Sequence, residues 1–305
     1  MNAEAIILPI EETSIHKKLQ QFKEIDYKTS IKKIGLGTVQ FGTTYGINNK
    51  YGKTTSNEVD KILNLATSNG INLIDTASAY GDAEEVLGKN NLAHFNIVSK
   101  FMPVKRGDSI KMQFNKSIED LHVASLYGYL AHRPLALIDD LKTWEELQNL
   151  KKDGLIKKIG FSLNEPSELE ALLEHGLIPD LIQVPYNYFD SRFENQMISF
   201  KEKGCEIHTR STFLQGLFFM NPVNLNPYFE EVKVLIEKLQ QNTKSLANSL
   251  LRYVLEKTFI DKVIIGVENS NQFRQNIEML GDAEKLPMQT HSISENILMP
   301  SKWPK

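Results

Sequence analysis

The chain has 305 residues, a formal net charge of −3 and 41% hydrophobic residues. These values fit a folded protein of one large or two ordinary domains, and the near-neutral charge argues against a nucleic-acid partner. No apolar run reaches the roughly 20 residues of a membrane span, and the N-terminal segment lacks the pattern of a secretory signal. The single cysteine, Cys205, excludes an internal disulfide, and the sequence holds no metal-ligand motif. We therefore expect a cytoplasmic protein without a membrane or metal partner.

Short apolar runs alternate with amphipathic segments from about residue 34 onward. We expect strands at residues 34–36, 73–75, 97–100, 125–131, 158–162, 181–185, 206–209 and 262–265. Helix signals recur between them. A capping box at residues 55–58 precedes apolar residues at helical spacing, and Gly70 ends that helix. A second capping box lies at residues 143–146, and Pro166 suits the first turn of a helix that ends near residue 175.

Eight strand–helix units predict an α/β protein with parallel strands, namely a single-domain (β/α)8 TIM barrel. The alternative is a doubly wound sheet, but residues 35–38 lack the third glycine of its usual phosphate loop. We expect an N-terminal extension at residues 1–30, the barrel at 31–280 and a C-terminal tail at 281–305. Apolar residues at positions 15, 19, 22 and 25 predict an amphipathic helix in the extension. Three prolines in the tail predict irregular chain that packs over one barrel mouth.

Four residues suited to proton transfer follow three successive predicted strands: Asp75, Tyr80, Lys100 and His132. Taken singly, each has an ordinary interpretation, such as a turn residue, a solvated lysine or a core histidine. A lysine beside a core strand is costly unless it is paired, and Asp75 on the neighbouring strand end is a suitable partner. A charged Lys100 next to Tyr80 would stabilise the phenolate and make Tyr80 a usable general acid. His132 would then orient a substrate oxygen.

These residues resemble the signature of the aldo-keto reductase family. Residues 75–81 (Asp-Thr-Ala-Ser-Ala-Tyr-Gly) are similar to its first motif, and the lysine and histidine strand ends match at Lys100 and at residues 131–134. The resemblance runs from about residue 34 to residue 280. It implies a barrel that binds NADPH, or less often NADH, and passes a hydride to a carbonyl carbon. It also implies a catalytic tetrad of Asp75, Tyr80, Lys100 and His132.

The resemblance further implies a cofactor site whose members are spread over the carboxyl ends of the strands. Its candidates are Gly37 and Thr38 near the nicotinamide ribose, Ser162 and Gln183 at the carboxamide, Arg210, Ser211, Gln215 and Gly216 around the pyrophosphate, and Gly266, Gln272 and Asn276 at the adenosine phosphate. Independently of the family, barrels often bind phosphate at the loops after strands seven and eight, where a helix N-terminus offers N–H groups.

Three positions depart from the family pattern. Leu163 separates Ser162 from Asn164, where the family often has Ser-Asn, and Arg210 stands where many members have an aromatic residue that stacks on the nicotinamide. Glu268 stands where NADP-using members have basic or hydroxyl residues, and its carboxylate would repel a 2′-phosphate. The resemblance favours NADPH as the cofactor, because the family binds NADH less often, and NADH is the alternative.

The expected substrate is a small carbonyl compound. The loop at residues 39–48 mixes amide, hydroxyl and aromatic side chains, which suits a sugar-like carbonyl, and it resembles a bacterial branch of the family linked to sugar or surface-polysaccharide metabolism. Two rival functions are a nicotinamide-binding regulatory barrel without turnover and a lyase that forms a Schiff base on Lys100. The oligomeric state stays open.

Overall fold

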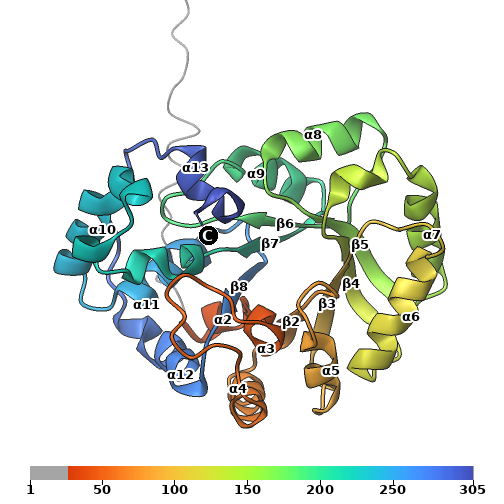
Figure 1. Cartoon of the computed structure of the whole chain (residues 1–305), viewed down its shortest axis with the longest axis horizontal. Helices are drawn as coiled ribbons and strands as arrows, with labels where there is room; N and C mark the ends of the chain where they lie inside the picture. Colours follow the sequence, from red (N-terminus) through yellow and green to blue (C-terminus); the bar gives the residue numbers. More distant parts are fainter. Residues whose placement is uncertain (1–26, 305) are drawn as a thin grey trace, which may run out of the picture.

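The strands of the computed structural model, which describes residues 27–304, close into a single parallel barrel in sequence order (Figure 1). The strands are β1 Ile34–Gly37, β2 Leu73–Asp75, β3 Asn96–Phe101, β4 Leu126–Ala131, β5 Ile156–Ser162, β6 Leu181–Pro185, β7 Glu206–Arg210 and β8 Lys262–Gly266. All eight lie where the sequence predicted them. The (β/α)8 barrel is confirmed, and the doubly wound alternative is wrong because β1 pairs with β8.

Helices form the outer ring of the barrel (Figure 1). They are α2 Tyr27–Ile31, α3 Val39–Gly42, α4 Ser56–Ser68, α5 Ala83–Gly88, α6 Ile110–Leu121, α7 Leu141–Lys152, α8 Pro166–Glu174, α9 Glu194–Glu202, α10 Glu230–Asn242, α11 Leu246–Leu255, α12 Ser270–Glu278 and α13 Glu295–Leu298. Short 3-10 turns add η1 Pro134–Leu137, η2 Leu214–Phe219, η3 Pro222–Asn224, η4 Pro227–Phe229, η5 Met279–Asp282 and η6 Pro300–Lys302. The predicted helix on positions 15–25 lies outside the described residues.

The two predicted capping boxes fare differently. The hydroxyl of Thr55 accepts the N–H of Glu58, which is one half of the first predicted capping box, and α4 follows it directly. The other half does not form, because the Glu58 carboxylate accepts from Lys61 and Ser270 instead. The second prediction is wrong, because α7 begins at Leu141 after Asp140 and already contains Thr143. The Thr143 hydroxyl donates instead to the side chain of Asp140 at 2.7 Å.

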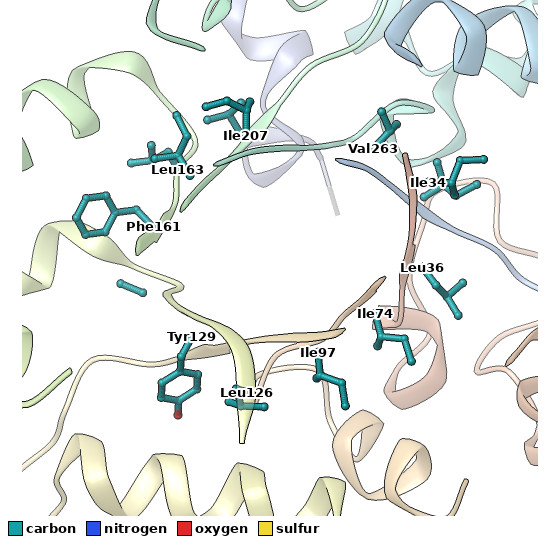
Figure 2. Close-up of a cluster of buried hydrophobic side chains, with 14 of the residues drawn as sticks. Ile34, Leu36, Ile74, Ile97, Leu126, Tyr129, Phe161, Leu163, Ile207 and Val263 are labelled. Atoms are coloured by element: carbon teal, nitrogen blue, oxygen red, sulfur yellow. The ribbon is translucent and has the colours of Figure 1, made fainter. Parts of the chain in front are cut away.

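Side chains alternate between the two faces of each strand, so the barrel has an outer and an inner core. Figure 2 shows Ile74, Ile97 and Phe161 pointing away from the barrel axis, into the main apolar cluster between strands and helices. A small inner cluster fills the barrel itself and consists of Leu73, Val98, Leu130, Leu181 and Ile264. The inner face is therefore a packed layer and not a pore.

A charged layer lies inside the barrel at the amino ends of the strands. Glu206 accepts from Tyr127 Oη at 2.7 Å and pairs with Lys158 and with His208 Nε2, each at 2.7 Å. Burial opposes ionisation of Glu206, but the hydrogen bond and charge of His208, together with Lys158, hold its pKa well below the usual range. Groups at this end of such barrels commonly serve stability.

The C-terminal residues pack beside the carboxyl end of the barrel. Ile297 and Trp303 share an apolar cluster with Tyr188 and Leu214, which follow β6 and β7. The Trp303 indole donates to the carbonyl of Ile297 at 3.0 Å. After η5, the described residues up to 304 form only α13 and η6 as regular turns, and the division into extension, barrel and tail stays a prediction. Within residues 27–304, no helix is long and apolar enough to cross a membrane.

Candidate active site

The candidate site residues form the layer directly above the inner apolar cluster. Asp75 stands two positions after Leu73 on β2, and Lys100 stands two positions after Val98 on β3. The same step places Gln183 two positions after Leu181 on β6. Because side chains repeat every second residue, Asp75, Lys100 and Gln183 face the same inner side of the barrel as the apolar residue two positions before each of them. The polar groups therefore meet at the carboxyl ends of the strands, where barrel enzymes place their chemistry.

Lys100 is the buried centre of this layer. Its ammonium lies 2.7 Å from Asp75 Oδ2, donates to the carbonyl of Thr76 at 2.8 Å and reaches Tyr80 Oη at 3.5 Å. Lys100 is 0% exposed and Asp75 4% exposed. Burial is the largest single influence and would lower the pKa of Lys100, but the charges of Asp75 and Tyr80 and the hydrogen bonds to both together raise the pKa above its ordinary value. The ion pair keeps Lys100 protonated beside the phenol.

A close backbone contact sets the position of Tyr80. A Cβ atom on Gly42, at the end of α3, would come 1.6 Å from the carbonyl oxygen of Tyr80. Gly81 has φ of +62°, a conformation that favours glycine, and a Cβ there would meet the Gly42 carbonyl at 2.5 Å. The loops after β1 and β2 therefore touch through two glycines, and this contact holds the Tyr80 backbone beside β3.

A second chain of hydrogen bonds extends the polar layer across the barrel. Gln183 Nε2 donates to Asp75 Oδ1 at 2.6 Å, and the Ser162 hydroxyl contacts Gln183 Oε1 at 3.4 Å. Thr38 donates its hydroxyl to the backbone carbonyl of Asp75 at 3.0 Å. The structure thus brings the predicted residues Thr38, Ser162 and Gln183 together with Asp75. Contact of Gln183 with the carboxylate was not predicted, because the two residues are 108 positions apart.

His132 follows β4 and faces Tyr80, with ring centroids 5.7 Å apart in an edge-on arrangement. Its Nδ1 atom is buried and has no hydrogen-bond partner among residues 27–304. A buried N–H without an acceptor is costly, so the neutral ring keeps its proton on Nε2. The pKa of His132 is lowered to about 4, because burial disfavours the charged ring and the positive charges of Lys100 and Arg210 add to this effect. His132 is therefore a neutral hydrogen-bond donor.

We expect His132 to stay neutral through the physiological pH range. The ratio of kcat/KM for the unaltered protein to that for His132→Gln should stay constant from about pH 5.5 to 8, because neither side chain titrates there. Steady-state rates across this range measure it, and a ratio that changes near pH 6.5 contradicts it. Since the folded pKa lies below the ordinary 6.5, His132 also destabilises the fold as the pH falls from about 6.5 toward 4.

The predicted pyrophosphate segment has an unusual backbone. Ser211, Leu214, Gln215 and Gly216 all have positive φ, between 44° and 90°. Gln215 Nε2 donates to Tyr45 Oη at 2.9 Å, and its carbonyl accepts from the backbone of the loop after β1. The segment after β7 is thus hydrogen-bonded to the loop after β1, and Gln215 and Gly216 lie at the barrel mouth.

Arg210, at the end of β7, extends sideways along the mouth toward β5. Its Nη2 donates to the Leu163 carbonyl at 2.9 Å and to Asn164 Oδ1 at 2.7 Å, and its Nη1 donates to the Ser211 hydroxyl at 3.2 Å. The extra residue Leu163 is fully buried. The Asn164 side chain anchors the Arg210 guanidinium.

The predicted adenosine-phosphate segment surrounds the start of α12. Gly266 pairs with Gly37 of β1, and a Cβ on Gly266 would meet Gln40 Oε1 at 2.7 Å. Gln272 Oε1 accepts the N–H of Glu268 at 2.8 Å. Gln272 therefore borders the loop after β8, where the prediction placed it.

Asn276 follows Gln272 by one turn of α12. It is 4% exposed, and its backbone carbonyl accepts from Asn248 of α11 at 3.1 Å. A role for its side chain at the adenosine phosphate stays a prediction.

Glu58 is a polar contact of this region that the sequence did not reveal. Its carboxylate accepts both the N–H and the hydroxyl of Ser270, the first residue of α12, at 2.8 Å each. These bonds, with one from Lys61, lower the pKa of Glu58 to about 2. In the sequence, Glu58 is only the third residue of a helix, and no local pattern links it to a partner 212 positions away.

Family comparison decides the class of the protein. The model of the "Aldo/keto reductase family" matches residues 33–297, which is most of the chain. The chain belongs to the aldo/keto reductase family. This aldo/keto reductase is 30% identical over 208 residues to a glyoxal reductase of Bacillus subtilis, covering 66% of this chain and 70% of the relative. It is 24% identical over 296 residues to an uncharacterized oxidoreductase of Bacillus subtilis, covering 86% and 93%.

Solved structures share the fold of this reductase. An aldo-keto reductase from Bacillus halodurans, in its holo form, superposes with a TM-score of 0.66 at 21% identity, over 84% of this chain and 88% of the other. An aldo-keto reductase from Klebsiella pneumoniae in complex with NADPH superposes with a TM-score of 0.60 at 22% identity, over 84% and 87%. Because the chain belongs to the aldo/keto reductase family, it is an NAD(P)H-dependent reductase.

Proposed function

We propose that this reductase reduces a polar, sugar-like aldehyde or ketone, with Tyr80 as the general acid. The observation that carries the proposal is the buried Lys100–Asp75 pair, whose ammonium donates toward Tyr80 Oη at 3.5 Å. Because Lys100 donates to the phenol oxygen, the phenol proton is left for another acceptor. The accessible Nε2 of His132 lies on the same side as Tyr80. Two donors thus converge on one point, as a carbonyl oxygen requires.

In the proposed reaction, a nicotinamide held by Ser162 and Gln183 would supply the hydride that the carbonyl carbon accepts. The carbonyl π electrons move to oxygen, and Tyr80 transfers its phenol proton to that oxygen, which yields an alcohol. Lys100 stabilises the phenolate that remains, and Asp75 keeps Lys100 charged. His132 donates from Nε2 and orients the carbonyl oxygen. Solvent then returns a proton to Tyr80, so charge and protons balance over one turnover.

The residues at the mouth fit a dinucleotide with a pyrophosphate. The Thr212 hydroxyl, in the segment between Ser211 and Gln215, is buried and has no hydrogen-bond partner in the described part of the chain. A phosphate oxygen is a suitable acceptor for such a hydroxyl and for the N–H groups of a segment with positive φ. Ser162 and Gln183 would hold the carboxamide, and Gly37 and Thr38 would lie near the nicotinamide ribose. We propose NADPH as the cofactor, supported by the NADPH complex of the Klebsiella pneumoniae neighbour, with NADH as the alternative.

The cofactor proposal is tested by fluorescence titration with NADPH and NADH in parallel. Tight binding of either supports the reductase, and failure of both at millimolar concentration contradicts it. Glu58 already satisfies the donors of Ser270, and its charge opposes a 2′-phosphate at α12. Glu58→Gln should therefore shift the Kd ratio toward NADPH by about five- to tenfold. Glu278→Gln removes the same charge at the far end of α12 and should leave the ratio unchanged.

The Schiff-base rival is disfavoured by the state of Lys100. A nucleophilic lysine must be neutral and accessible, whereas Lys100 is fully buried and paired with Asp75, with its pKa raised. Borohydride trapping of a carbonyl compound on Lys100 in the absence of nicotinamide would favour the lyase instead.

A further inference from the structure

We infer that Glu84 of α5 is a positioning residue that holds the loop of Tyr80 against the strand of Lys100. The inference rests on the proposed role of Tyr80 as general acid, and it adds a residue that lies outside the polar layer of the barrel. Its basis is the segment at residues 78–84, which is hydrogen-bonded at both ends to two consecutive residues of β3, Ser99 and Lys100.

The first of these contacts lies at the start of the loop. The backbone N–H and the hydroxyl of Ser78 both donate to the carbonyl of Lys100, at 3.1 and 3.0 Å. Tyr80 follows two positions later, and the ammonium of the same Lys100 reaches its Oη at 3.5 Å. Backbone and side chain of Lys100 therefore both contact this loop, so a shift of the loop along β3 changes the distance between the phenol and the ammonium.

The second contact lies at the other end of the segment. Ser99 donates its hydroxyl to Glu84 Oε1, and Ser117 of α6 donates to Oε2 at 3.1 Å. Among residues 27–304, the bond from Ser99 is the one hydrogen bond that joins α5 to β3. Glu84 is 5% exposed and Ser99 is 0% exposed. The contact is thus shielded from water, where a hydrogen bond is stronger than at the surface.

A short turn connects Tyr80 to Glu84. The N–H of Ala83 donates to the Tyr80 carbonyl at 3.2 Å, and Gly81 between them has φ of +62°. Few backbone dihedrals separate the phenol from α5, so a displacement of the helix also moves Tyr80. A carboxylate is costly to bury, whereas an apolar side chain would suffice to pack a helix on a strand. Glu84 therefore sets the alignment of α5, and with it of Tyr80, along β3.

The contact between α5 and α6 does not depend on Glu84. Gly88, the last residue of α5, lies so close to α6 that a Cβ atom on it would come 2.0 Å from the carbonyl oxygen of Asp120. The two helices therefore stay together without the bond from Ser117. No second hydrogen bond joins α5 to β3 in the described part of the chain. Losing the bond from Ser99 should thus free α5 along β3, while losing the bond from Ser117 should not.

Single-turnover reduction of 4-nitrobenzaldehyde, with enzyme saturated with NADPH, tests the inference. A loss of folded protein lowers the amplitude of this reaction and leaves its rate constant unchanged. Glu84→Ala should lower the rate constant by about 10- to 100-fold, as expected when a reacting group is displaced by about 1 Å. Glu84→Gln should stay within about threefold of the unaltered protein, because an amide can still bridge two hydroxyls.

Two serine variants form a matched pair, because each removes one hydroxyl from the carboxylate. Ser99→Ala should lower the rate constant about fivefold or more, since it releases α5 from β3, and Ser117→Ala should lower it by less than about twofold. The Kd for NADPH should stay unchanged in both. Equal rate constants in the two variants, a Glu84→Gln variant as slow as Glu84→Ala, or an effect confined to the Kd for NADPH overturns the inference.

Tyr80→Phe, measured in the same assay, separates this inference from the proposed function. A slow Tyr80→Phe together with an unimpaired Glu84→Ala overturns only the role of Glu84 and leaves the reductase proposal intact. An unimpaired Tyr80→Phe overturns both, because Glu84 would then have no proton donor to position.

Discussion

Replacing Tyr80 with phenylalanine should lower kcat by about 10²- to 10⁴-fold, the usual contribution of a positioned general acid. The variant loses one hydroxyl that touches Lys100 at 3.5 Å and keeps the aromatic ring beside His132. The loss should appear in kcat more than in KM, since proton transfer belongs to the transition state. Single-turnover oxidation of NADPH by a reactive aldehyde measures it directly.

The Tyr80 experiment also separates the reductase from a non-catalytic nicotinamide-binding barrel. The Kd for NADPH in Tyr80→Phe should stay near that of the unaltered protein, which shows that the cofactor site is intact. Tyr51→Phe is the matched control, because this tyrosine is 73% exposed and lies outside the site. If Tyr80→Phe retains more than about a tenth of the activity, another group supplies the proton.

Replacing Lys100 with methionine should abolish most activity and also destabilise the fold. Asp75 would remain buried with its charge unpaired, and breaking a buried ion pair costs about 3–5 kcal/mol. Urea unfolding followed by circular dichroism measures the free energy of unfolding. The methionine side chain fills nearly the same space, so the cost reports the lost charge and not a cavity.

A double variant separates the two effects of Lys100. Adding Asp75→Asn to Lys100→Met removes the unpaired charge and should recover at least half of the lost free energy of unfolding, because a neutral amide costs less to bury. Activity should not return, because the phenolate would still lack its ammonium. Recovery of activity in the double variant would contradict the role proposed for Lys100.

The barrel itself was readable from the sequence because its signal is local. Each strand is a short apolar run between turn residues, and eight such runs in alternation with helices leave few architectures. The position of Asp75 and Lys100 was also readable, since both directly end an apolar run and strands have a strict two-residue period. These features need only neighbouring residues, which the sequence displays.

Contacts between distant segments were not readable in the same way. Arg210 and Asn164 are 46 positions apart, and nothing near either one indicates that they bond. The start of α7 was misplaced for a local reason, since Asp140 and Thr143 are both residue types that favour the N-cap position and the helix begins after the earlier one.

The contact between Gly42 and the Tyr80 backbone marks where the sequence of the first loop becomes free to vary. Gly42 touches the backbone of Tyr80 so closely that any larger residue would displace Tyr80. Beyond Gly42, the loop through Tyr45 and Ile47 is partly exposed and borders the mouth. New substrate preferences can therefore evolve, or be engineered, by rewriting the chain after Gly42 while the chemistry of the barrel is inherited unchanged.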